Sequence, residues 1–119
     1  MIKKNIKKII SVSSFITLFL TQTAFAASGS SVTYSNRGTS TTTTSYGGQA
    51  LTATATFIYT SNQIGSEIRS TQTTTGTGPS SLSATAYTKH EICNPRRTEG
   101  VHIVNGWAEY YSGKSVGYY

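Results

Sequence analysis

Three side chains able to do chemistry lie close together in the sequence: His90, Cys93 and His102. A cysteine beside a histidine can form a nucleophile and its base, and all three can bind zinc. A hairpin tip over residues 94–98 would place both histidines at similar heights on adjacent strands. His90 and Cys93 are three residues apart, however, so a regular strand points them to opposite faces. We therefore expect ordinary strand positions, with no metal site and no cofactor.

Cys93 is the single cysteine of the chain, so no disulfide can form within it. In an exported protein such a thiol is either buried or joins two chains. The sequence thus leaves Cys93 as a buried thiol or as the site of an intermolecular disulfide.

The acidic residues argue against hydrolytic chemistry. The chain has four glutamates and no aspartate. It therefore cannot form a Ser-His-Asp triad or an aspartate-rich calcium loop. Glu91 and Glu99 flank the expected tip, and paired carboxylates can hydrolyse glycosides. Pairing of these acids with Lys or Arg across strands is the simpler interpretation. We expect that the protein is not an enzyme and rank a small hydrolase last.

Aromatic residues gather at the C-terminal end, and they are the candidate binding residues. Adjacent tyrosines on a strand point to opposite faces, so some of these rings must be exposed. Exposed rings flanked by hydroxyls suit stacking on sugars, a membrane interface or a protein partner. Cross-strand aromatic pairing that stiffens the sheet is the alternative. The five residues are Trp107, Tyr110, Tyr111, Tyr118 and Tyr119.

The N-terminus has the pattern of an export signal. Lys3, Lys4, Lys7 and Lys8 precede an apolar run over residues 9–20, and Ala24-Phe25-Ala26 forms a small–x–small cleavage site. The run is shorter than the ~18–20 residues that span a bilayer. We predict a signal peptide over residues 1–26, no permanent membrane anchor, and secretion (or a periplasmic location where an outer membrane exists).

Removal of that segment changes the charge. The formal net charge of +6 loses four lysines and becomes +2, from six basic and four acidic side chains. Without a basic stripe, nucleic-acid binding is not expected.

The remaining 93 residues have the composition of a thin-cored β protein. They contain 18 Thr, 14 Ser and 11 Gly, but only 12 Leu, Ile, Val and Phe together. Such a low aliphatic content is typical of disorder, yet disorder usually requires a high net charge. Eight tyrosines, one tryptophan and the threonines favour strands.

Residues 50–60 alternate almost perfectly between apolar side chains and threonine, which predicts a strand with one buried face. The apolar positions are Leu51, Ala53, Ala55, Phe57 and Tyr59. Further strands are expected over 64–75, 81–93, 99–111 and 115–119, with one edge strand near 32–35. Turns are expected at 61–63, 76–80, 94–97 and 112–114. Asn105-Gly106 is either a two-residue turn or a bulge.

These elements predict an all-β fold, a small antiparallel sandwich or barrel of five to seven strands. Residues 27–47 form a Ser/Thr-rich, partly loose segment, and residues 48–119 form the β domain. A domain this small buries only ~60–65% of its unfolded surface, so marginal stability or self-association is expected.

Four short segments resemble the lactococcin-type secreted bacteriocins in their order: Tyr34-Ser35-Asn36, Ser83-Ala84-Thr85, Gly106-Trp107-Ala108 and Tyr118-Tyr119. Those small exported β-sandwich proteins act on the envelope of related bacteria, in the best-known case by binding a cell-wall precursor. The resemblance implies an antibacterial role and assigns no function to particular residues.

Two functions therefore stand ahead of the hydrolase. The first is a binding module at the cell envelope or outside the cell, bacteriocin-like, whose partner is a cell-wall or envelope component or a protein. The second is a structural component of an extracellular matrix or surface layer, assembled through strand association.

Overall fold

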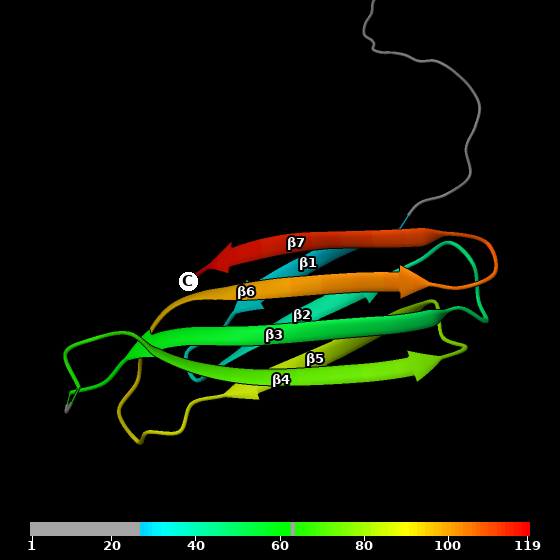
Figure 1. The fold of residues 1–119 in the computed structure, drawn as a ribbon. Helices are drawn as coiled ribbons and strands as arrows, with labels where there is room; N and C mark the ends of the chain where they lie inside the picture. The colour runs from blue at the N-terminus through cyan, green and yellow to red at the C-terminus, as the bar shows by residue number, and fades with distance from the viewer. Residues whose placement is uncertain (1–26, 63) are drawn as a thin grey trace, which may run out of the picture.

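The computed structural model describes residues 27–62 and 64–119 (Figure 1). The signal peptide predicted for residues 1–26 lies outside the described residues. In the described part, no helix is long and apolar enough to cross a bilayer. The strands are β1 (Ser28–Thr33), β2 (Arg37–Thr43), β3 (Ala50–Thr60), β4 (Ile68–Thr77), β5 (Ser81–Tyr87), β6 (Asn94–Asn105) and β7 (Tyr110–Tyr118).

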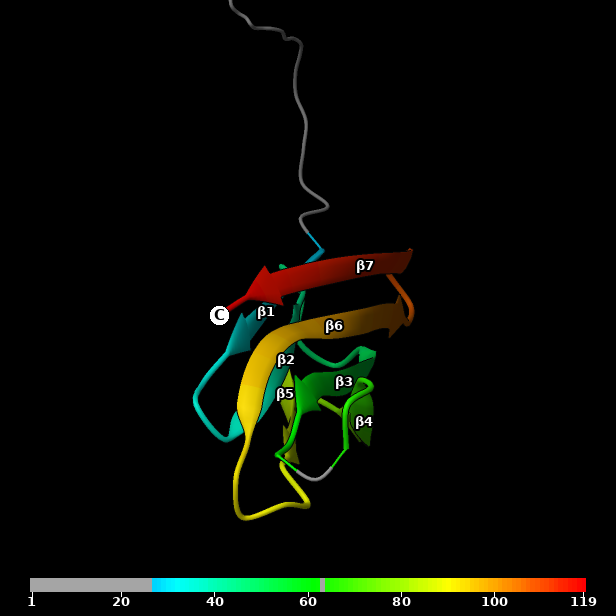
Figure 2. The same ribbon diagram turned by 90° about the vertical axis from the view of Figure 1, so that its left-hand side faces the viewer.

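These strands form two antiparallel sheets that pack face to face, as predicted for a small sandwich (Figures 1 and 2). The three-stranded sheet has the order β1-β2-β5, and the four-stranded sheet has the order β4-β3-β6-β7. At one side of the sandwich β1 lies against β7, and at the other β4 lies against β5.

The prediction of a partly loose segment over residues 27–47 was wrong. Two complete strands, β1 and β2, occupy most of it. The single edge strand predicted near residues 32–35 overlaps only the end of β1. The inner face of β2 carries Ser40 and Thr42, both fully buried, rather than aliphatic side chains. A search for apolar alternation cannot detect a strand whose buried face is hydroxylated.

The hairpin tip predicted at Asn94-Pro95-Arg96-Arg97 was also misplaced, because these residues begin β6. The loop lies earlier, over residues 88–93. The Tyr59 hydroxyl holds it, accepting from the Lys89 backbone N–H at 2.9 Å. Pro95 is tolerated at the start of the strand, where the β3–β6 register shifts between Ile58 and Tyr59.

The end of the chain is one strand where the sequence predicted a turn. Residues 112–114 lie inside β7. Asn105-Gly106 is neither a two-residue turn nor a bulge, because Asn105 pairs with Tyr110 across a four-residue loop over 106–109. The Gly106 backbone N–H donates to the Glu109 carbonyl at 3.1 Å and closes this loop.

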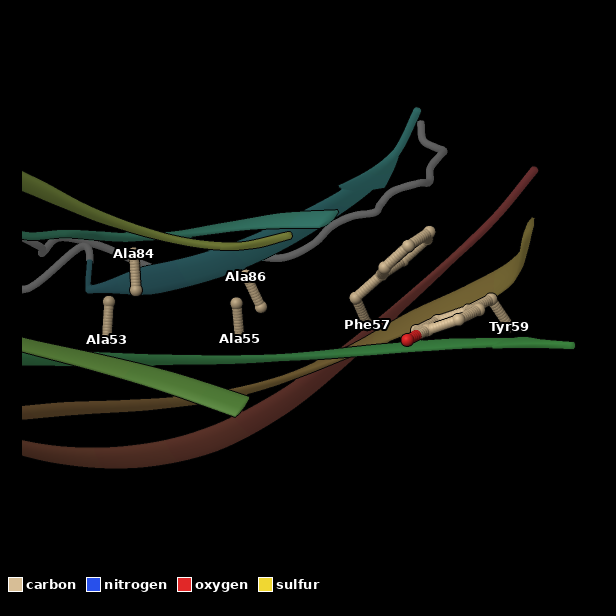
Figure 3. Close-up of a cluster of buried hydrophobic side chains, with 6 residues drawn as sticks. All are labelled: Ala53, Ala55, Phe57, Tyr59, Ala84 and Ala86. Atoms are coloured by element: carbon tan, nitrogen blue, oxygen red, sulfur yellow. The ribbon is translucent and has the colours of Figure 1, made fainter. Parts of the chain in front are cut away.

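The strand β3 confirms the alternation seen in the sequence and supplies most of the apolar core. Its inner side chains are fully buried: Leu51, Ala53, Ala55, Phe57 and Tyr59. Figure 3 shows Ala53 facing Ala84, and Ala55 facing Ala86, from the opposite sheet. The Phe57 and Tyr59 rings stack at 5.1 Å between centroids and fill the wider end. Small residues thus let the sheets approach closely at one point, and two aromatic rings fill the space at another.

The other half of the interior is polar. On β6 the buried side chains are Thr98, His102 and Val104, whereas Val101 and Ile103 lie on the outer side. A Cβ added to Gly100 would come within 2.4–2.7 Å of the hydroxyls of Ser31, Ser40 and Ser115. Those hydroxyls come from β1, β2 and β7, so four strands meet at this glycine.

We predict that Gly100→Ala destabilises the protein by about 1–3 kcal/mol, because overpacking a close-packed interior forces its neighbours apart. Gly65→Ala is the matched control, since a Cβ there meets nothing within 4 Å. It should change the free energy of unfolding by less than about 0.5 kcal/mol. Urea denaturation measures both, and equal stabilities of the two variants would contradict the prediction.

Candidate functional site

The five candidate aromatic residues do not form one cluster. Trp107 lies in the β6–β7 loop and is 74% exposed, and Tyr110 begins β7 at 69% exposed. Tyr118 and Tyr119 lie at the other end of β7 and are 77% and 70% exposed. Eight residue steps at about 3.3 Å each separate Tyr110 from Tyr118 by roughly 26 Å. Tyr111 is half-buried on the inner side, where its ring lies over Gly113.

The loop that carries Trp107 is anchored by a buried glutamine. Gln49 is fully buried, and its Oε1 accepts from the backbone N–H groups of Ala108 at 3.1 Å and Glu109 at 3.2 Å. Its Nε2 donates to Thr44 Oγ1 at 3.2 Å. Both residues that follow Trp107 are therefore held to the start of β3. Sequence reasoning missed Gln49, although it continues the inner-face series of β3 by one further step.

Tyr46 supports the Trp107 ring from one side. The two rings meet edge-on, with centroids 5.6 Å apart and planes at 65°. Gly48 lies beside them at φ +81°, and a Cβ there would come 3.6 Å from Trp107 Nε1. The indole is consequently fixed by its loop and by Tyr46, while most of its surface faces solvent.

The opposite end of the molecule combines tyrosines with arginines. The Arg37 guanidinium lies 4.3 Å from the centroid of the Tyr34 ring, a cation–π contact. Tyr118 pairs with Arg97 across the β6–β7 ladder, and the Tyr119 backbone N–H donates to the Arg96 carbonyl at 3.2 Å. This end is therefore aromatic and rich in arginine, and its Arg97 is paired with Glu67 and Glu99.

His102 is fully buried between the sheets, and its hydrogen bonds fix its tautomer. Thr42 Oγ1 donates to the Thr52 carbonyl at 2.8 Å, so its one proton is committed. His102 Nδ1, 2.9 Å from that hydroxyl, must then be the donor. In the neutral ring Nε2 carries no proton and accepts from Ser115 Oγ at 2.6 Å.

The same reasoning gives the direction of the hydrogen bonds in the chain of serine hydroxyls that continues from His102. Because the Ser115 hydroxyl donates its hydrogen bond to His102, it accepts from the Ser31 hydroxyl at 2.6 Å. The Ser31 hydroxyl in turn accepts from the Ser40 hydroxyl at 2.8 Å. A serine that donates to a histidine resembles a catalytic pair, with Thr42 in the place of the carboxylate. The His102 ring has no exposed surface, however, so a substrate cannot reach it. Burial lowers the pKa of His102 and keeps the ring neutral.

The structure does not bring His90, Cys93 and His102 together. His90 Nδ1 lies 2.8 Å from the Tyr59 hydroxyl, in the loop before β6, whereas His102 pairs with Ala53, six residues before Tyr59 on β3. Because the tip at 94–98 is absent, the two histidines are not neighbours on adjacent strands. Cys93 is half-buried and packs against the apolar core. Residues 27–62 and 64–119 contain no group of three metal-ligating side chains.

Two of the four glutamates, Glu67 and Glu99, form ion pairs with arginines. Arg97 contacts Glu67 at 2.9 Å and Glu99 at 3.1 Å, and Arg69 contacts Glu99 at 3.3 Å. Hydrogen bonds from Arg97 lower the pKa of both glutamates. A glycosidase acid needs a raised pKa instead. Glu91, on the loop over 88–93, lines a small hollow of about 110 Å³ with His90.

No family model, curated protein or solved structure matches the chain. What the two aromatic ends can bind follows from their chemistry. A ring that is exposed and held in place can stack on a sugar ring or on an apolar group of a partner.

We predict that stability falls as the pH drops from 7.5 to 5. The folded pKa of His102 lies below its unfolded value of about 6.5, so the unfolded chain binds more protons in this interval. His102→Gln should be less stable at pH 7.5 but should lose this pH dependence, which is at most about 1.4 kcal/mol per pH unit for one proton. Denaturation at several pH values measures both quantities.

Gly65→Ala, which removes no titratable group and places its Cβ in open space, is the control for this experiment and should keep the wild-type slope. Glu67 and Glu99 titrate mainly below this interval, because their unfolded pKa is about 4.3 and Arg97 lowers it further in the folded protein. Equal slopes for His102→Gln and wild type would contradict the prediction.

Proposed function

We propose that the protein acts outside the cell as a binding module for a polymer of the cell envelope, with the Trp107 ring as its main contact. The observation that carries this is that Trp107 is 74% exposed and yet held by Gln49 and Tyr46. An exposed indole offers a ligand a large, flat apolar face and one N–H donor. Fixing the ring in advance lowers the entropic cost of binding.

The surroundings of the ring favour a sugar polymer. An indole offers a flat apolar face and one N–H donor, which suit a sugar ring with its C–H face and peripheral hydroxyls. The residues that lie against the ring are Tyr46 and Gly48, and both are uncharged. A neutral hydroxylated ligand therefore fits this loop better than a nucleic acid or an anionic surface.

The second aromatic end extends the contact. Tyr110, Lys114 and Tyr118 alternate with the half-buried Tyr111 and Ser115, so they share the outer face of β7. Rings about 26 Å apart on one strand can contact distant units of the same chain. Two weak contacts on one ligand strengthen each other through effective concentration. A long polymer uses both ends, whereas a small molecule uses one.

The export signal and the bacteriocin resemblance support a location at the envelope. An antibacterial action would follow if the bound polymer belonged to a related bacterium. Binding of the polymer is required both for a binding module alone and for an antibacterial protein, so it is the step to test first.

Trp107→Ala should reduce retention of the mature protein on purified cell walls by about tenfold, the effect of losing a single anchor worth about 1.4 kcal/mol. Tyr87→Ala is the matched control, because Tyr87 is also exposed but lies on β5 in the other sheet. It should bind like wild type. A co-sedimentation assay with cell walls, together with an unfolding curve for each variant, measures this.

Two results would contradict the proposal: no retention of the wild-type protein on any wall preparation, or equal retention of the folded Trp107→Ala variant. Growth inhibition measured with the same variants then separates a bacteriocin-like action from binding alone.

One observation favours the structural alternative, assembly through strand association. The strand β4 is an edge of its sheet, ten residues long, with Arg69 as its only charged residue and no proline. An edge of this kind is open to pairing with another chain. Two copies paired antiparallel about Thr73 would place Thr71 opposite Thr75, repeating the Thr–Thr pairs that β4 makes with β3.

If β4 mediates assembly, the wild-type protein should associate with increasing concentration, and Thr73→Lys should shift it towards monomer. Two lysines would then face each other across the new pair. Thr54→Lys, on the same face but one strand further in, is the control and should associate like wild type. Sedimentation velocity measures this, and a wild-type monomer at every concentration would exclude assembly by β4.

A further inference from the structure

Three side chains at the base of the Trp107 loop have an arrangement that the binding function does not require. Thr44 is buried just after β2, and its Oγ1 donates to the Glu109 carboxylate at 3.1 Å. The same oxygen accepts from the Gln49 Nε2 at 3.2 Å. A hydroxyl thus lies between a carboxylate that can take its proton and a carboxamide that can react with it.

The carbonyl of that carboxamide is held as in an oxyanion hole. Gln49 Oε1 accepts from two backbone N–H groups, those of Ala108 at 3.1 Å and Glu109 at 3.2 Å. Two donors aimed at one carbonyl oxygen polarise the carbon and stabilise the negative charge that forms on attack. Nucleophile, base and oxyanion donors therefore converge on one amide.

We propose that Thr44 and Gln49 join in an intramolecular ester, with Glu109 as the base. Thr44 Oγ attacks Gln49 Cδ while Glu109 takes the hydroxyl proton, and the carbonyl oxygen carries the negative charge between the two N–H groups. When the tetrahedral intermediate collapses, the C–N bond breaks, and Glu109 returns the proton to the leaving nitrogen. The products are an ester and one molecule of ammonia. Glu109 is regenerated, and no oxidant, metal or other reactant is required.

The hydroxyl oxygen and the amide nitrogen are hydrogen-bonded before the reaction. Attack therefore requires the carboxamide to turn its face towards Oγ1 while Oε1 remains close to the two N–H groups. This turn makes the reaction a slow maturation step after folding. Gln49 and Thr44 are 0% and 3% exposed, so water that would hydrolyse the ester is largely excluded.

The bond would link the end of β2, in one sheet, to the start of β3, in the other. Only four residues separate Thr44 from Gln49, so the loss of chain entropy on closure is small. Its main effect is to fix the base of the loop that carries Trp107. This modification does not depend on what that ring binds.

The test is the intact mass of the mature protein after folding and incubation. The wild type should be lighter by one ammonia, about 17 Da. Fragmentation should place the loss between Thr44 and Gln49, and hydroxylamine, which cleaves esters, should open the link. Thr44→Val and Glu109→Gln preserve the side-chain shape but remove the nucleophile and the base, so both should keep the full mass.

Asn105-Gly106 is the control, because an asparagine before glycine can also lose ammonia by cyclising. Asn105→Ser should still show the loss. A wild-type protein that stays at full mass overturns the proposal, as does a loss of ammonia that persists in Thr44→Val. Formation of the link at an unchanged rate in Glu109→Gln would exclude Glu109 as the base.

Discussion

The hydrogen bond from Thr42 to the Thr52 carbonyl determines how half of the interior is organised. A buried hydroxyl that lacks a partner costs free energy comparable to a lost hydrogen bond. Because Thr42 gives its proton to a carbonyl, His102 must donate to Thr42 and accept from Ser115. Every later hydroxyl in the chain is then oriented in turn. One bond between the sheets thus settles the direction of four other hydrogen bonds across β1, β2, β6 and β7. A polar interior of this kind is stable only when every member is paired.

The composition follows from this constraint. Hydroxyls can bond across the interior only if the sheets lie close together, and this closeness leaves no room for a Cβ at several positions. The His102 ring occupies the space beside Gly29, and the Thr98 side chain occupies the space beside Gly38. Serine, threonine and glycine are therefore required on the inner faces of β1 and β2. The apolar half, centred on β3, supplies the hydrophobic free energy that the hydroxylated half lacks.

The sequence predicted best where the usual physical pattern holds. The bounds of β3 and its buried face follow from the alternation of apolar residues and threonine, and the all-β sandwich follows from composition. The strands β1 and β2 were not predicted from the sequence, because a buried face of serine and threonine has the same residue types as an exposed face. The exposure of tyrosines was predictable from adjacent pairs, but their division between two ends was not, since a turn was expected at residues 112–114. Gln49 was detectable only by extending the inner-face series of β3 into a polar residue.

Gln49 shows how the rule that stabilises the interior also presents the candidate site. Its carboxamide is buried, so both its oxygen and its nitrogen need partners, and these partners lie in the Trp107 loop and at Thr44. The loop is consequently fixed by the pairing requirement of a core residue rather than by contacts of its own. Trp107 can remain exposed without being mobile, because the hydrogen bonds that hold it are made beneath it. In a sandwich with so little aliphatic core, buried polar groups that must be paired are the means by which the sheets impose a defined shape on a surface loop.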